Sequence, residues 1–404
     1  MKIMHDQTIE KSHNNSPLAK ILFNMLTNIS HGSLKVITPD GKHHYFSGTK
    51  TGEDVCVSIN DWRFCDELLL KGDVGLGESY VLGYWDCDNI NMLVKWGIEN
   101  KEPLERAIKG SITKILFYRF KHFLKRNSKK GSIKNIHAHY DIGNKFYQLW
   151  LDSTMTYSSA IFKSSNEKLS EAQENKYQNI LNKLKPKDGD HILDVGCGWG
   201  GFAEYLGKNY NVKLDCITIS KKQYQFAKER IYKIGLNEKI NIEIKDYRDL
   251  KGKYDSIASI EMIEAVGQNY LQSYFNTIKN NLSKNGNAAI QSITIDDNLF
   301  DRYKTKEDFI QKYIFPGGFL PSKKSLYNYA ESNGLILDEC NSYAKHYSDT
   351  LIIWRKEFNN KWSLIKNQGF DLTFKKMWEF YLSYCEAGFK SKNIDLIQFS
   401  LCNK

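Results

Sequence analysis

The amino-acid sequence predicts an α/β protein, in which a parallel sheet with helices on both faces follows a smaller α+β domain. Two observations lead to this prediction. From residue 191 onward, short apolar runs alternate with segments of helical periodicity, which is typical of strand–helix units in a parallel sheet. Before residue 100, apolar and polar residues alternate around a turn, which is typical of a β-hairpin.

The composition fits a globular chain with two domains. Its 404 residues are enough for two cores, and no apolar run approaches the length that spans a bilayer. The first residues contain acids and lack an apolar core, so we expect no export signal and a cytoplasmic location. The eight cysteines show neither C-x-x-C pairs nor metal-ligand spacing, which predicts reduced thiols and no metal site.

The N-terminal domain is expected to span residues 1–126. Apolar residues recur at helical spacing in residues 13–30, and this amphipathic helix either faces the core or contacts a membrane. Residues 33–60 alternate around Pro39-Asp40-Gly41, which predicts a hairpin, and a short helix begins at Ile90.

A basic segment lies at the end of this domain. Residues 101–134 hold eleven Lys or Arg against two Glu, which is most of the net charge of +10. From Leu104 to Arg126, apolar and basic residues mix at helical spacing, so this is either a membrane-interface helix or an inter-domain helix with a solvated basic face. Basic segments also attract nucleic acid, but the chain lacks the Asn-Pro-Pro-aromatic motif for a flipped base, and we expect no nucleic-acid partner. Residues 127–136 are predicted to be a linker.

The second domain is expected to span residues 137–404. Strands are predicted at 191–195, 212–219, 240–245, 254–260 and 286–295, and helices at 200–208, 221–234 and 268–282. Ligands of such sheets bind beyond the carboxyl ends of the strands. The polar residues at or near these ends are therefore expected to face one site: Thr218, Asp246, Glu261, Glu264 and Gln291.

A glycine-rich turn follows the first predicted strand of this domain. Gly196, Gly198 and Gly201 match the G-x-G-x-x-G spacing of nucleotide-binding turns, whose free amide groups face a ligand. Asp194 stands before the first glycine and can accept hydrogen bonds from an ammonium or hydroxyl group. The next strand ends near Thr218, without an acid for a ribose diol. The pattern favours S-adenosylmethionine over a nicotinamide cofactor, and a purely structural turn is the remaining alternative.

Eight different short motifs lie between residues 137 and 400. They are His139–Asn144, Met155–Ala160, Ile192–Gly201, Thr218–Gln223, Ile263–Gly267, Lys312–Gly318, Tyr347–Leu351 and Cys385–Phe389. Together they resemble the cyclopropane-fatty-acid synthase family, and the Gly-Glu-Ser-Tyr stretch around Glu78 resembles that family's N-terminal lipid-binding domain. The resemblance implies a Rossmann-like class I methyltransferase domain at residues 137–404.

The resemblance also implies an activity, the transfer of the methyl group of S-adenosylmethionine to the cis double bond of an unsaturated phospholipid acyl chain, which yields a cyclopropane ring. Attack leaves a carbocation, for which the rings of Tyr157, Phe162, Phe315 and Tyr347 are candidate walls. In this family the base that closes the ring resembles a bound bicarbonate ion. Its implied ligands are Ser159, Glu264, Gln291, the backbone of Ile293, and Tyr347.

Matching positions imply a set of cofactor-binding residues. They are Tyr157, Ser158, Gly196, Gly198, Gly200, Thr218, Gln223, Tyr247 and Arg248. Asp194 joins them because it precedes the glycines. Cys385 matches a cysteine with a suspected active-site role in the family, and a buried thiol without a catalytic role is the alternative. The resemblance further implies peripheral contact with the inner face of the membrane, and it leaves a homodimer open.

Three positions depart from the family pattern. Ser159 stands where cysteine is common, Gln291 where histidine is common, and Glu261 where a small residue is common. If Glu261 and Glu264 share an inward face, their repulsion raises one pKa and supplies a base without bicarbonate. Otherwise Glu261 is an outward cap residue or pairs with a lysine. The departures leave the product open between a cyclopropane ring and a methylene-branched chain. A non-catalytic lipid-binding module is the alternative outside enzymes.

Overall fold

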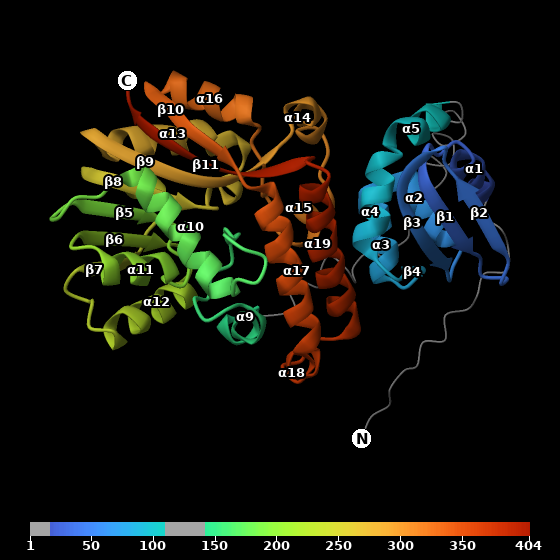
Figure 1. Cartoon of the computed structure of the whole chain (residues 1–404), viewed down its shortest axis with the longest axis horizontal. Helices are drawn as coiled ribbons and strands as arrows, with labels where there is room; N and C mark the ends of the chain where they lie inside the picture. Colours follow the sequence, from blue (N-terminus) through green and yellow to red (C-terminus); the bar gives the residue numbers. More distant parts are fainter. Residues whose placement is uncertain (1–16, 110–141) are drawn as a thin grey trace. The chain divides into compact units, whose positions relative to one another are not determined.

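The computed structural model describes residues 17–109 and 142–404 (Figure 1). The chain divides into two compact units. Among the described residues, 17–109 and 371–387 form the N-terminal unit, and 142–370 with 388–404 form the large unit. The predicted linker and most of the predicted basic helix lie outside the described residues. Only the start of that helix is described, as α5 (Lys101–Lys109).

The N-terminal unit is built on a mixed sheet with the strand order β2-β1-β3-β4. The sheet contains the predicted hairpin, because β1 and β2 pair antiparallel, while β3 pairs with β1 in parallel. Helix α1 buries the side chains of Leu18, Leu22, Met25 and Leu26, so its amphipathic pattern reflects a core-facing helix. Besides α5, the described elements of this unit are β1 (His31–Ile37), β2 (His43–Ser47), β3 (Lys50–Ile59), β4 (Trp85–Cys87), α1 (Pro17–Leu26), α2 (Arg63–Lys71), α3 (Asp73–Val81) and α4 (Ile90–Glu99).

Helix α19 (Leu372–Lys390) corrects the predicted domain range of 137–404, since its residues 372–387 pack with the N-terminal unit. Lys376 forms an ion pair with Asp86 at 2.9 Å. The Tyr384 hydroxyl donates to Asp73 at 3.2 Å. Sequence periodicity predicts a helix here, but it cannot say which unit a helix packs against.

The large unit contains, among its described residues, a seven-stranded sheet with the order β10-β11-β9-β8-β5-β6-β7. The five predicted strands are confirmed, although β9 begins earlier than expected because α13 ends at Asn281. The strands are β5 (His191–Val195), β6 (Lys213–Thr218), β7 (Ile240–Ile244), β8 (Tyr254–Ile260), β9 (Leu282–Ile295), β10 (Leu335–Ser342) and β11 (Ile394–Asn403). The helices are α9 (Asn144–Trp150), α10 (Leu169–Leu184), α11 (Gly201–Asn209), α12 (Lys221–Lys233), α13 (Leu271–Asn281), α14 (Asp297–Tyr303), α15 (Phe309–Tyr313), α16 (Lys323–Ser332), α17 (Ala344–Asn360) and α18 (Trp362–Lys366).

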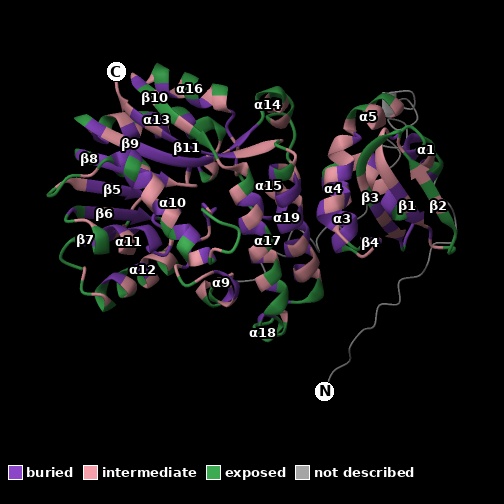
Figure 2. Ribbon diagram, viewed as in Figure 1, coloured by how far each residue is buried: buried purple, intermediate pink, exposed green. Residues whose placement is uncertain are grey.

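Apolar side chains cover both faces of this sheet, and the central strands are mostly buried (Figure 2). Successive residues of β5 point to opposite faces. Ile192 belongs to the apolar cluster that includes residues of α10, α11 and α12, and Leu193 belongs to the cluster that includes residues of α13 and α16. Burial on both faces explains the continuous apolar runs in the sequence. Among the described helices, none combines the length and the apolar character that crossing a bilayer requires.

The strand order places the site. The strands β5 to β9 run parallel, and the order reverses between β5, which pairs with β6 on one side, and β8, which pairs with it on the other. In open sheets of this kind, ligands bind outside the carboxyl ends of the strands at such a reversal. Asp194 lies near the end of β5, and Glu261 follows the end of β8.

Candidate active site

The glycine-rich turn joins β5 to α11. Gly196, Gly198 and Gly200 have φ angles of 87°, 54° and 79°, in the left-handed region that favours glycine. A Cβ on Gly196 would lie 2.8 Å from Cγ of Met262, whereas a Cβ on Gly198 would meet nothing within 4 Å. Gly196 therefore serves packing, and Gly198 borders open space in which a ligand can approach the main chain.

We expect Gly198→Ala to weaken binding of S-adenosylmethionine by at least about tenfold, which corresponds to about 1.4 kcal/mol. Gly235 provides a matched control, because its φ is 71° and a Cβ there also meets nothing within 4 Å. Both substitutions should cost about 1 kcal/mol of stability through their left-handed backbone. Only the Gly198 variant places a methyl group where the ligand approaches. Calorimetric titration measures the two Kd values, and equal values would contradict the assignment.

Asp194 is a buried acid beside this turn, 2% exposed. Its Oδ2 atom is shielded from solvent and has no hydrogen-bond partner among the described residues. Burial raises the pKa of Asp194 to about 7, and the positive charge of Lys176 opposes this shift. Buried polar atoms normally have a partner. A carboxylate oxygen without one, next to an open glycine turn, fits the amino group of S-adenosylmethionine.

The other predicted cofactor residues lie at the carboxyl ends of the neighbouring strands. Thr218 ends β6, and its hydroxyl donates to Oε1 of Gln223 in the first turn of α12 at 2.8 Å. Tyr247 and Arg248 lie in a short 3-10 turn after β7. Arg248 forms an ion pair with Asp246 at 2.6 Å, which raises the pKa of the guanidinium. The sheet therefore gathers these positions along one edge with Asp194 and the glycines.

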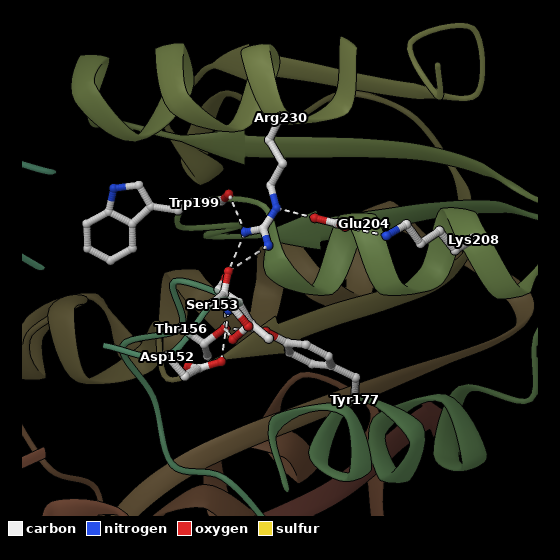
Figure 3. Close-up of polar contacts among 9 residues, drawn as sticks. Asp152, Ser153, Thr156, Tyr177, Trp199, Glu204, Lys208 and Arg230 are labelled. Carbon is white, nitrogen blue, oxygen red and sulfur yellow. Dashed lines mark hydrogen bonds and ion pairs between the residues drawn. The ribbon is translucent and has the colours of Figure 1, made fainter. Parts of the chain in front are cut away.

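Arg230 fixes the loop that leads into the site (Figure 3). It reaches from α12 and pairs with Glu204 of α11. Its Nη1 atom also donates to the carbonyl of Thr154 at 2.7 Å and to that of Trp199 at 3.3 Å. The same loop is held from α10, where the Tyr177 hydroxyl bonds the Thr156 hydroxyl. These contacts tie residues 154–156 to the glycine-rich turn and so position the residues that follow them.

Tyr157 follows this loop and lies in an aromatic cluster. Its ring centroid is 5.1 Å from that of Tyr147, 5.2 Å from that of Trp354 and 6.3 Å from that of Phe315. Trp354 in turn lies 6.3 Å from the ring of Tyr347. The structure thus brings together three of the four predicted aromatic walls. Electron-rich ring faces of this kind attract a cation.

Glu261 is the centre of the polar part of the site. Its Oε1 atom accepts hydrogen bonds from the Ser159 N–H at 2.8 Å and from Nε2 of Gln291 at 2.7 Å. Its Oε2 atom accepts a hydrogen bond from the Tyr347 hydroxyl at 2.7 Å. The interpretation of Glu261 as an outward cap residue is therefore wrong. Its backbone φ of 49° turns the side chain inward in a way that helical spacing cannot predict.

Glu264 supplies a second carboxyl group, from the 3-10 turn at Ile263–Ala265. Its Oε1 atom accepts the Ile293 N–H at 2.5 Å, and its Oε2 atom is shielded from solvent without a partner among the described residues. Burial, followed by the charge of Glu261, raises the pKa of Glu264 to about 8. Burial therefore raises the pKa of both carboxyl groups, Glu261 and Glu264, above their ordinary value.

Lys176 is a part of the site that sequence reasoning missed. It lies on α10 with no exposed surface, and its Nζ atom donates to the Ser158 hydroxyl at 2.8 Å. Burial lowers the pKa of Lys176 to about 7, and the charges of Glu261 and Asp194 among others oppose this shift. The sequence signal was available, because this lysine falls on the helical spacing of the apolar residues that α10 buries.

Two predicted residues have other surroundings. Phe162 stacks on His346, with ring centroids 6.4 Å apart, rather than joining the contacts of Tyr157. Cys385 is half-buried in the part of α19 that belongs to the N-terminal unit, while the other candidates lie in the large unit. A role for Cys385 stays a prediction.

The fold and the site define the class of protein. A sheet of this order, a glycine turn beside a buried acid at the strand reversal, and an aromatic cluster beside buried carboxyl groups are features of an S-adenosylmethionine-dependent methyltransferase. The family model for mycolic acid cyclopropane synthetase matches residues 127–399. The chain belongs to this family and is a C-methyltransferase that uses S-adenosylmethionine, so a non-catalytic lipid-binding module is set aside.

Two relatives illustrate the range of the family. The chain is 33% identical over 349 residues to the cyclopropane-fatty-acyl-phospholipid synthase of Escherichia coli, covering 85% of this chain and 86% of that one. It is 32% identical over 349 residues to the tuberculostearic acid methyltransferase of Mycobacterium tuberculosis, covering 82% and 79%. A solved mycolic acid cyclopropane synthase, complexed with SAH and CTAB, is 28% identical with a TM-score of 0.62, covering 68% of this chain and 98% of that one.

Proposed function

We propose that this enzyme converts the cis double bond of an unsaturated phospholipid acyl chain into a cyclopropane ring. The observation that supports this best is the connection, through Tyr347, between the aromatic cluster and the carboxyl groups. Tyr347 donates to Glu261 and contacts Trp354, the neighbour of Tyr157. A cation that forms between rings and carboxylates is stabilised by both. The Escherichia coli relative carries the corresponding name.

Bound S-adenosylmethionine supplies the electrophilic methyl group. The residues of the chain then have separate roles. Asp194 and the glycine turn hold the donor, which fixes the methyl group in line with the alkene. The ring faces of Tyr157 and Tyr347 stabilise the carbocation that the alkene becomes. The enclosed carboxylates lower the energy of that cation further, and one of them receives the proton that is lost when the ring closes.

Bicarbonate, the base that the resemblance implies, does not fit the site as it is built. Three of its implied ligands, Ser159, Gln291 and Tyr347, already donate to the carboxylate of Glu261. A fourth implied ligand, the Ile293 N–H, donates to Glu264, which is itself the fifth. No step is therefore assigned to bicarbonate.

The proposed acceptor is a membrane phospholipid, so we place the reaction at the inner membrane surface of the cell. The proposal is tested by incubation of the full chain with S-adenosylmethionine and vesicles of a cis-unsaturated phosphatidylglycerol, followed by mass spectrometry and proton NMR of the acyl chains. We expect a gain of one CH2 with upfield ring protons. Vinylic methylene protons with the same gain would instead indicate a methyltransferase that forms a methylene branch. No mass gain would overturn the proposal.

A further inference from the structure

Glu261 adopts a backbone conformation that is unusual for its residue type. It is the first residue after β8, and its φ of 49° lies in the left-handed region. Residues other than glycine rarely adopt this strained conformation, which persists where the surrounding structure determines it. Three hydrogen bonds to the carboxylate of Glu261 are the surroundings that do so here. A strained residue whose side chain is held this firmly points to a function.

The donors around Glu261 form a seat for a planar group with two oxygen atoms. Ser159 and Gln291 donate to one oxygen, and Tyr347 donates to the other. Ser159 and Gln291 have no exposed surface. The carboxylate of Glu261 and a bicarbonate ion share the O–C–O geometry that such donors recognise. The carboxylate of Glu261, which is part of the protein chain, therefore occupies the seat that the family resemblance assigns to a free bicarbonate ion.

A hydrogen bond from Gln398 fixes the orientation of Gln291, one of the donors in this seat. Nε2 of Gln398, on β11, donates to Oε1 of Gln291 at 2.8 Å, so the amide of Gln291 presents its NH2 group to Glu261. Gln398 also has no exposed surface. The buried ammonium group of Lys176 acts on Glu261 electrostatically and opposes the effect of burial, which raises the pKa of Glu261. These groups favour an ionised Glu261 in a defined orientation.

One acceptor position of the Glu261 carboxylate has no hydrogen-bond partner among the described residues. A carboxylate oxygen has two acceptor positions. Oε1 uses both, for Ser159 and Gln291, whereas Oε2 uses one, for Tyr347. The free position on Oε2 lies beside the hydroxyl of Tyr347, whose ring borders the aromatic cluster.

We propose that Glu261 is the catalytic base of the ring-closing step, in place of bicarbonate. The inference rests on the proposed function. After methyl transfer, a C–H bond of the new methyl group breaks and its electron pair forms the third carbon–carbon bond of the ring, which cancels the charge of the cation. The proton passes to Oε2 of Glu261. A carboxylate is a sufficient base because the cation withdraws electron density from the methyl group on the neighbouring carbon, which makes the C–H bonds of that methyl group strongly acidic. The protonated Glu261 then returns its proton to solvent after the product leaves.

The test is an assay of ring formation in buffer freed of carbon dioxide, with and without added sodium bicarbonate. We expect the wild-type enzyme to give the same rate in both. Glu261→Gln keeps the shape of the side chain but removes the base, so turnover should fall by at least about 100-fold. Bicarbonate should not restore it, since the amide still occupies the seat. Glu331→Gln, at an exposed position of α16, is the matched control and should retain the wild-type rate.

Glu261→Gly gives the complementary result. Glycine tolerates a φ of 49° and opens the seat. Turnover of this variant should be lost without bicarbonate and restored when bicarbonate is added. Loss of wild-type turnover on removal of bicarbonate would overturn the inference, as would wild-type ring formation by Glu261→Gln. The wild-type comparison requires no variant to fold. If the wild-type enzyme forms no ring in either buffer, the proposed function fails, which is a distinguishable outcome.

Discussion

Glu264→Gln is expected to lower turnover by about two to three orders of magnitude while S-adenosylmethionine still binds. Glutamine keeps the volume of the side chain and can still accept the Ile293 N–H, but it removes a negative charge. That charge stands in an enclosed site in which the reaction develops positive charge, and the Oε2 atom of Glu264 is shielded without a partner among the described residues. Preorganised electrostatic groups of this kind contribute about 10²–10³ to kcat.

The measurement is kcat on unsaturated phospholipid vesicles, with the Kd of S-adenosylmethionine from calorimetry. The exposed Glu331→Gln variant again serves as the control for the same chemical change. A kcat of Glu264→Gln within twofold of the wild type would remove Glu264 from the mechanism.

The pH dependence of kcat tests the role of Glu264 independently. The pKa of Glu264 is raised to about 8, so its protonated form dominates below that pH and its charged form above it. Because the charged form stabilises the cation, kcat of the wild type at saturating donor should rise as pH increases through about 8. In Glu264→Gln this rise should be absent.

Asp194→Asn is expected to weaken binding of S-adenosylmethionine by about 10- to 100-fold. A charge-assisted hydrogen bond contributes about 1.5–3 kcal/mol, and about 1.4 kcal/mol corresponds to a factor of ten. Asparagine matches the shape of Asp194 but offers no charge to the ammonium group of the ligand. Asp188→Asn, at an exposed position, is the control. An unchanged Kd for Asp194→Asn would place the ligand's amino group elsewhere.

The affinity of the wild type should also depend on pH. The pKa of Asp194 is raised to about 7 by burial, so the free protein must lose a proton to bind a cation below that pH. The Kd should therefore fall as pH rises from about 6 to about 7.5. Asp194→Asn should show a smaller change over the same range, because its amide does not titrate.

Much of the large unit follows from local patterns. The strands and the glycine-rich turn are predicted from runs of a few residues, and the rule on strand ends correctly gathers Thr218, Glu264 and Gln291 near one edge. The rest depends on contacts that are remote in the sequence. Glu261 and Glu264 do not share a helical face, because the first has a left-handed backbone and the second lies in a 3-10 turn. Spacing alone could not decide where Glu261 points.

The partners of Lys176 and the packing of residues 371–387 also depend on contacts that are remote in the sequence. Lys176 could be suspected from the sequence as a charge on an apolar face, but not the identity of its partners. The place of residues 371–387 in the N-terminal unit is decided by contacts such as Lys376 with Asp86, which no periodicity encodes.

The pairing of Gln398 with Gln291 has a consequence for the nascent chain. The two residues face each other across β11 and β9, and 107 positions separate them in the sequence. A shift of one residue in this pairing would turn Gln398 to the opposite face of the sheet. Because β11 lies near the C-terminal end of the sequence, the ribosome synthesises the site residues from Tyr157 to Tyr347 before it synthesises β11, the strand that carries Gln398. Methyl transfer should begin only after β11 has been synthesised and has docked in register.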